Sequence, residues 1–126
     1  MNAYKLLIIG LGGFLGSVAR YVITKFVDDK LSPSFPYGTL TVNILGSFLL
    51  GIIYIIALRK AGLTENGRLF LGVGFCGGFT TFSAFALENF SMMQERFLGT
   101  SLLYISLSVV GGILALGAGV WAARFV

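Results

Sequence analysis

The sequence predicts an all-α membrane protein of four transmembrane helices, forming a single domain over residues 1–126. The chain is 56% hydrophobic and only 11% charged, and its mean hydropathy is +0.92. Its apolar residues gather in four segments of about 20 residues, which is the length needed to cross a bilayer. A chain this short has no room for a second domain.

The predicted spans are about residues 4–27, 37–58, 68–92 and 98–123. The first connection, Asp28 to Pro36, contains both prolines of the chain, where a missing backbone donor costs little. The stretches Arg59 to Gly67 and Gln94 to Phe97 make the other connections. Met1 to Ala19 looks like a signal peptide but lacks a convincing cleavage site, so we expect it to belong to the first span.

Composition excludes several classes of function. Cys76 is the single cysteine and the chain has no histidine, which argues against a disulfide, a zinc site or a haem site. The net charge of +4 comes from basic residues scattered near the segment ends, a pattern typical of membrane topology rather than nucleic-acid binding. No nucleophile–base pair or nucleotide-binding motif is present, so we do not expect an enzyme.

The topology signal is weak. With four spans, one side of the membrane would hold five basic residues: Lys5, Arg59, Lys60, Arg68 and Arg124. The other side would hold three, Lys25, Lys30 and Arg96, and Arg20 would lie inside the first span. So small a bias over short loops leaves a fixed orientation and an antiparallel homodimer both open. Size favours an oligomer, because four short helices hardly enclose a pathway. Small residues suited to close helix contacts are abundant: Gly12 and Gly16, Gly74 and Gly78, and the stretch Gly111 to Gly119.

The third span is unusual between Gly72 and Glu88. It carries no charge from Leu69 to Leu87, yet it contains a Gly77-Gly78 pair followed by a Thr80-Thr81 pair. Glycine weakens helix propagation, and threonine hydroxyls offer the backbone other partners. The pattern predicts a broken helix at the centre of an ion or solute pathway, because freed backbone groups in a bilayer must be satisfied by protein, water or an ion.

Neutral polar residues recur on single helix faces. One face of the second span carries Thr39, Asn43 and Ser47, and one face of the fourth carries Ser101, Tyr104 and Ser108. On the third span, Thr80, Thr81 and Ser83 surround the phenylalanines. Such residues donate hydrogen bonds without carrying charge, which suits a pathway for a small anion. The alternative is that serine and threonine bond their own helix backbone. Asn43 is the exception, because a buried primary amide needs several partners.

Three further features have two interpretations each. Arg20 either snorkels to the interface or forms an anion-attracting vestibule. Phe82 and Phe85 either belong to a packing stripe with Phe75 and Phe79, or turn their positive ring edges toward an anion. Glu88 would repel an anion unless it is hydrogen-bonded, paired with a cation such as Arg20, or set to one side.

Three motifs together resemble the bacterial Fluc (CrcB) fluoride channels, and the resemblance covers essentially the whole chain. They are Gly77-Gly78-Phe79-Thr80-Thr81-Phe82-Ser83-Ala84-Phe85, Gly38-Thr39-Leu40-Thr41-Val42-Asn43, and Gly12-Gly13-Phe14-Leu15-Gly16-Ser17-Val18-Ala19-Arg20. The resemblance implies a passive, fluoride-selective channel that exports cytoplasmic fluoride across the bacterial inner membrane. It further implies a dual-topology antiparallel homodimer with two pores.

The resemblance also implies residue roles. Asn43, Phe82, Phe85, Tyr104 and Ser108 would line the fluoride pathway, and Arg20 would form a vestibule. The third helix would break, and the backbone carbonyls of Gly77 and Thr80 would hold a structural sodium ion at the dimer interface. Glu88 matches a family acid of open role. A hydroxyl that follows Ser108 by one turn in the family is replaced here by Gly112, so the polar track is not assigned beyond Ser108.

Two rival functions remain to be weighed. A small multidrug transporter has four short spans in a dual-topology dimer, but it needs a carboxylate within the first span, and here no acid precedes Asp28. A non-transporting assembly subunit would leave the polar faces and the broken helix unexplained.

Overall fold

The computed structural model describes residues 2–59 and 61–126, which are helical apart from short connections. Lys60, counted above among the basic residues, lies outside the described residues. The elements are α1 (Ala3–Lys30), α2 (Tyr37–Leu58), α3 (Glu65–Arg68), the π-helical segment η1 (Leu69–Cys76), α4 (Gly77–Phe79), α5 (Phe82–Gln94) and α6 (Leu98–Ala123). Because α3, η1, α4 and α5 together make the third span, the described residues form four apolar segments long enough to cross a membrane. The predicted all-α architecture with a broken third helix is confirmed.

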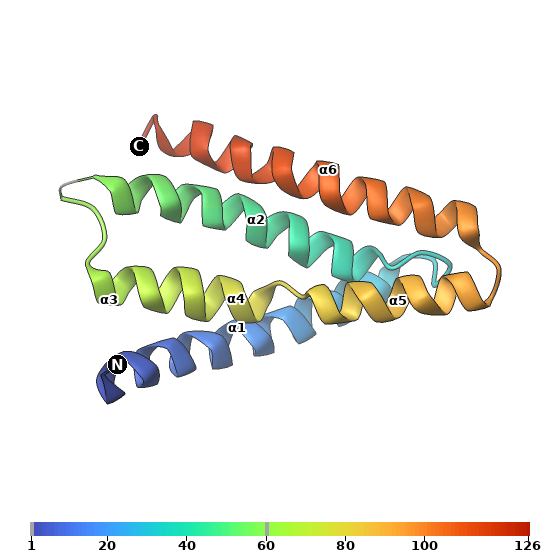
Figure 1. The fold of residues 1–126 in the computed structure, drawn as a ribbon, viewed down its shortest axis with the longest axis horizontal. Coiled ribbons are helices and arrows are strands. Elements are labelled where there is room, and N and C mark those ends of the chain that lie inside the picture. The colour runs from blue at the N-terminus through green and yellow to red at the C-terminus, as the bar shows by residue number, and fades with distance from the viewer. Residues whose placement is uncertain (1, 60) are drawn as a thin grey trace.

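The four spans run alternately up and down (Figure 1). Both termini and the connection between α2 and α3 lie at one end of the bundle, and the other two connections lie at the opposite end. Helix α2 packs mainly against α6, whereas α1 packs mainly against η1 and α4. The two halves of the third span therefore have different neighbours, since α5 packs against α6.

Helix α1 is longer than its predicted span and includes Asp28–Lys30, which we assigned to the connection. Local electrostatics explain the extension: Lys25 pairs with Asp29 one turn later (3.8 Å), and Lys30 places a positive charge at the helix C-terminus. Asp28 is also engaged, because its Oδ1 accepts a hydrogen bond from the Gly38 N–H at the start of α2 (2.8 Å). The polar end of α1 thus continues the helix and caps its neighbour.

The break in the third span lies at Thr80 and Thr81 and not at the glycine pair. Gly77 has helical dihedrals (φ −62°, ψ −37°), whereas Thr80 (φ −91°, ψ 160°) and Thr81 (φ −149°, ψ 120°) are extended. Thr81 then starts the second half-helix, since its Oγ1 accepts from the Ala84 N–H (3.1 Å). The helix stops because threonine oxygens offer its backbone other partners.

The glycines instead serve close helix packing. A Cβ at Gly78 would lie 2.5 Å from the carbonyl oxygen of Gly13, and one at Gly12 or Gly16 would clash with the backbone of η1. In the other pair of helices, a Cβ at Gly51 would clash with the carbonyl of Leu116. The predicted packing role is confirmed within one chain at these positions. The use of glycines between two chains stays a prediction.

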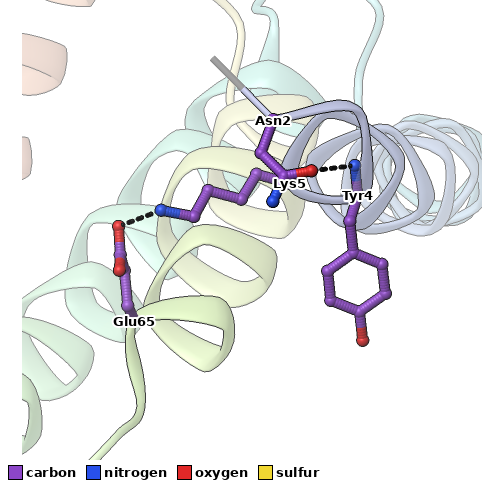
Figure 2. A network of polar contacts seen from close by, with 4 residues as sticks. All are labelled: Asn2, Tyr4, Lys5 and Glu65. Carbon is purple, nitrogen blue, oxygen red and sulfur yellow. Dashed lines mark hydrogen bonds and ion pairs between the residues drawn. The ribbon is translucent and has the colours of Figure 1, made fainter.

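Polar contacts tie the spans together at the end that carries the termini. Lys5 on α1 donates to Glu65 Oε1 on α3 (2.7 Å), and the Asn2 side chain accepts from the Tyr4 N–H to cap α1 (Figure 2). Arg59, just after α2, donates to the carbonyl oxygens of Ala123 and Val126 at the end of α6. Exposed ion pairs contribute only about 0–1 kcal/mol, so these contacts mainly fix how the helix ends are arranged.

Candidate anion pathway at the helix break

A cavity of about 370 Å³ lies beside the break, between α2, the third span and α6. Its lining is apolar or neutral, with no acidic or basic residue among the described residues that form it: Asn43, Gly46, Ser47, Leu50, Gly72, Cys76, Gly77, Thr80, Thr81, Phe82, Phe85, Ser108, Val109 and Gly112. Six of the eight residues proposed for ion binding line this one space. Tyr104 and Arg20 lie outside it.

Asn43 bridges α2 to the break. Its Oδ1 accepts from the Thr81 N–H (2.7 Å), and its Nδ2 donates to the Thr81 carbonyl (3.1 Å). The one side-chain amide of Asn43 thus satisfies both the N–H and the carbonyl of Thr81, which is extended and therefore outside the helical hydrogen-bond pattern. A second N–H remains on Nδ2, and the residue lines the cavity. This bridging role was not foreseen from the sequence, although the need of Asn43 for several partners was.

Gly77 and Thr80 are among the residues whose backbone carbonyls lose their usual helical donors at the break. In an α-helix the Gly77 carbonyl would accept from the Thr81 N–H and the Thr80 carbonyl from the Ala84 N–H. Here the first N–H donates to Asn43 Oδ1 and the second to Thr81 Oγ1. Gly77 and Thr80 are the two residues for which the family resemblance implies a sodium site.

Arg20 reaches the same break from α1. Its Nε donates to the Gly78 carbonyl (2.9 Å), a residue of the first half-helix. This places a guanidinium at the C-terminal end of that half-helix, where the helix dipole favours a positive charge. The structure therefore brings Arg20 to the break rather than to the lining of the cavity.

The aromatic residues divide into two groups across the break. Phe79 is buried and stacks on Phe75, with ring centroids 5.6 Å apart. Phe82 and Phe85 form a separate pair (5.7 Å), and Phe85 also contacts the ring of Tyr104 (5.1 Å). Phe82 and Phe85 therefore do not continue a single stripe with Phe75 and Phe79. Phe82 is 79% exposed although it lines the cavity.

Glu88 is held by two hydroxyl groups. Thr39 Oγ1 donates to one carboxylate oxygen (2.7 Å) and the buried Tyr104 hydroxyl donates to the other (2.9 Å). Of the three conditions under which Glu88 is compatible with an anion path, the structure shows the first, hydrogen bonding. Tyr104 thereby connects the ring of Phe85 to a second cavity of about 560 Å³, which Glu88 lines together with Asp28 and Glu95.

Ser108 differs from the other fourth-span hydroxyls. Its Oγ is buried and has no hydrogen-bond partner among the described residues, whereas the Ser101 hydroxyl donates to Asn89 Oδ1 (2.8 Å). A buried polar group left unsatisfied costs about 1–3 kcal/mol. Asn89 was missed from the sequence, because nothing in its spacing showed that it faces Ser101. Its Nδ2 donates to the Phe85 carbonyl (2.9 Å) and so supports the helix that carries Phe82 and Phe85.

Side chains offer little to a metal ion. No group of three or more histidine, cysteine, aspartate or glutamate residues that could hold one occurs in the described part of the chain. Backbone oxygens, which suit a hard ion, are also present at the break.

Comparison with known proteins identifies the family of the chain. The family model described as CrcB-like protein, Camphor Resistance (CrcB), matches residues 7–120. Similar curated proteins include two named fluoride-specific ion channel FluC. One, from Leptospira interrogans serogroup Icterohaemorrhagiae serovar copenhageni, is 48% identical over 96% of this chain and 96% of its own length. The other, from Chlorobium chlorochromatii, is 43% identical over 98% of this chain and 95% of its own length. With a match over nearly its whole length, the chain belongs to the CrcB family.

Proposed function

We propose that this protein is a passive fluoride-selective channel of the bacterial inner membrane that lets cytoplasmic fluoride leave the cell. The observation that carries the proposal is the cavity beside the break, which is lined by neutral hydrogen-bond donors and phenylalanines. A small anion loses its hydration on entering a membrane and needs N–H and O–H groups in its place. The relatives named fluoride-specific ion channel FluC supply the identity of the anion. The family is one of ion channels and not of enzymes.

In the proposed pathway the anion passes the ring edges of Phe82 and Phe85, the donors of Asn43 and Ser108, and the side chain of Tyr104, whose own O–H is donated to Glu88. Ring edges carry positive electrostatic potential, so they attract an anion more weakly than a cationic side chain would. Weak, successive sites allow conduction, since an ion must be able to leave each site as well as enter it. The hydroxyl groups on Glu88 support this route, because they moderate the negative charge next to Tyr104.

The working unit in this proposal is an antiparallel, dual-topology homodimer with two pores. The proposal accounts for the exposure of Phe82, because a second copy would cover this ring where it lines the cavity. The weak charge bias of the loops is compatible with insertion in both orientations.

A structural sodium ion on the dimer axis completes the proposal. The chemistry of the break fits it, because the carbonyls of Gly77 and Thr80 have lost their helical donors to Asn43 and Thr81. Two such carbonyls from each subunit would give a small oxygen cage suited to a hard cation. Sodium would supply positive charge that holds the two half-helix ends together. Asn43 and Arg20 would stabilise the backbone conformation of the break through their hydrogen bonds to it.

The multidrug-transporter rival finds no support. Asp28 is the first acid of the chain and lies at the end of α1. Its carboxylate accepts a hydrogen bond from the Gly38 N–H and so caps the N-terminus of α2.

Purified protein in liposomes tests the proposal, with fluoride and chloride electrodes following voltage-driven efflux. Fluoride efflux without chloride efflux is expected. Absence of fluoride flux from correctly folded protein would refute the channel, and equal flux of both anions would refute the selectivity.

A further inference from the structure

We infer that Ser47 on α2 is a further anion-binding residue, which forms a hydroxyl pair with Ser108 on α6 at the point where Gly112 leaves space. The inference rests on the proposed channel function and deepens it. Ser47 and Asn43 are four residues apart on α2 and therefore lie on the same face. Both line the cavity beside the break.

The first argument comes from a cavity that continues the one at the break. It has a volume of about 370 Å³, and the described residues that line it are Ser47, Ser108, Val109, Gly112, Ile113 and Leu116. The first four of these also line the cavity at the break, so the two spaces meet between α2 and α6. Ser47 and Ser108 bear the only polar side chains of this described lining. An anion entering this space from the break would have these two hydroxyls as its side-chain donors.

The second argument is the state of the Ser108 hydroxyl. Its buried oxygen has no hydrogen-bond partner among the described residues, and Ser108 lines the same space as Ser47. Serine in a transmembrane helix usually bonds the carbonyl of the preceding turn. A buried hydroxyl that does not do so is available to a ligand, and hydroxyl donors in a lining without an acid suit a dehydrated anion better than a cation.

The third argument is the position of Gly112. A Cβ at this position would lie 3.7 Å from Ser47 Oγ, which is an ordinary contact distance. Gly112 is therefore not required by packing against Ser47. Gly112 keeps the space between Ser47 and Ser108 open. Ser47 supplies from α2 the hydroxyl that α6 lacks at position 112.

The experiment measures fluoride efflux from liposomes for Ser47→Ala and for the matched control Ser106→Ala, which removes an exposed serine of α6. Loss of a hydrogen bond to an ion should slow flux by about tenfold or more in Ser47→Ala. The control should conduct like the unmodified protein. Adding Gly112→Ser to Ser47→Ala returns a hydroxyl to the same space from the other helix, and it should restore most of the flux.

Unchanged flux in Ser47→Ala would overturn the inference, as would an equal loss in Ser106→Ala. Failure of Gly112→Ser to restore flux in a folded double variant would overturn it as well. Size-exclusion profiles and melting temperatures verify folding, and Ser47→Thr, which retains the hydroxyl, should conduct even if Ser47→Ala folds poorly. An unmodified protein that passes no fluoride refutes the channel function itself, which separates the two failures.

Discussion

Replacing Asn43 by aspartate removes an N–H donor and adds a negative charge with almost no change in shape. The Nδ2 that donates to the Thr81 carbonyl becomes an oxygen, so two acceptors face each other where a 3.1 Å hydrogen bond existed. A charge about 5 Å from a passing anion, at an effective dielectric constant of about 20, raises the energy of the anion by about 3 kcal/mol. That energy corresponds to roughly a hundredfold slower passage. We expect fluoride flux through Asn43→Asp to be nearly abolished.

The assay compares Asn43→Asp with Asn89→Asp in the same liposomes. Asn89 is buried and, like Asn43, donates to a backbone carbonyl, that of Phe85, but it does not line the cavity. In both variants a carboxylate oxygen replaces the N–H that donated to a backbone carbonyl, so both lose this hydrogen bond. Only Asn43→Asp places a charge beside the proposed path. Normal flux in Asn43→Asp would refute a direct role for Asn43. Equal loss in both folded variants would assign the effect to helix stability instead.

Phe82→Ile should slow fluoride flux about 2- to 12-fold while the proposed dimer stays intact, because an aromatic contact worth about 0.5–1.5 kcal/mol is lost. Phe90→Ile, on the exposed surface of the same helix, is the control, and unchanged flux in Phe82→Ile would return Phe82 to a packing role. Gly78→Ala should destabilise the fold by about 1–3 kcal/mol, because its Cβ would meet the Gly13 carbonyl, whereas Gly117→Ala meets nothing within 4 Å and should melt near the unmodified temperature; equal melting of the two would contradict the packing argument. Replacing sodium by an organic cation at equal ionic strength should lower the melting temperature of the purified protein. If sodium is present at 100 times its dissociation constant, its removal costs about 2.7 kcal/mol of folding stability. A melting temperature independent of sodium would count against a structural ion.

Hydropathy was sufficient to predict the fold, because in a bilayer the spanning elements are also the apolar ones. The predicted spans 37–58 and 98–123 coincide with α2 and α6. The position of the break was less accessible. Glycine propensity pointed to Gly77 and Gly78, and the threonine hydroxyls pointed to Thr80 and Thr81. Of the two pairs the glycines stay helical, and Gly78 is needed for the close approach of α1. The helix is interrupted one turn later, where Thr81 caps the second half and Asn43 satisfies the backbone.

Part of the cavity lining was predictable from the sequence, since Asn43 and Ser108 line the cavity, whereas Tyr104 does not. Neutral polar residues within apolar spans pointed to Asn43, Tyr104 and Ser108 before any geometry was known. Their partners depend on how each helix is rotated, which spacing within one helix does not determine. Tyr104 therefore donates to Glu88, whereas Ser108 has no partner among the described residues. The roles proposed for these residues in ion passage stay predictions.

The break is stable because polar groups of other helices replace its missing helical bonds. Asn43 from α2 takes both backbone groups of Thr81, and Arg20 from α1 takes the carbonyl of Gly78. In a bilayer these groups would otherwise have to be satisfied by water, which would give the break an open and variable shape. A break held from two sides instead has fixed dihedrals, so its remaining carbonyls point in fixed directions. That rigidity is what a backbone cation site requires, and it makes Asn43 a structural residue of the break as well as a proposed donor to the anion.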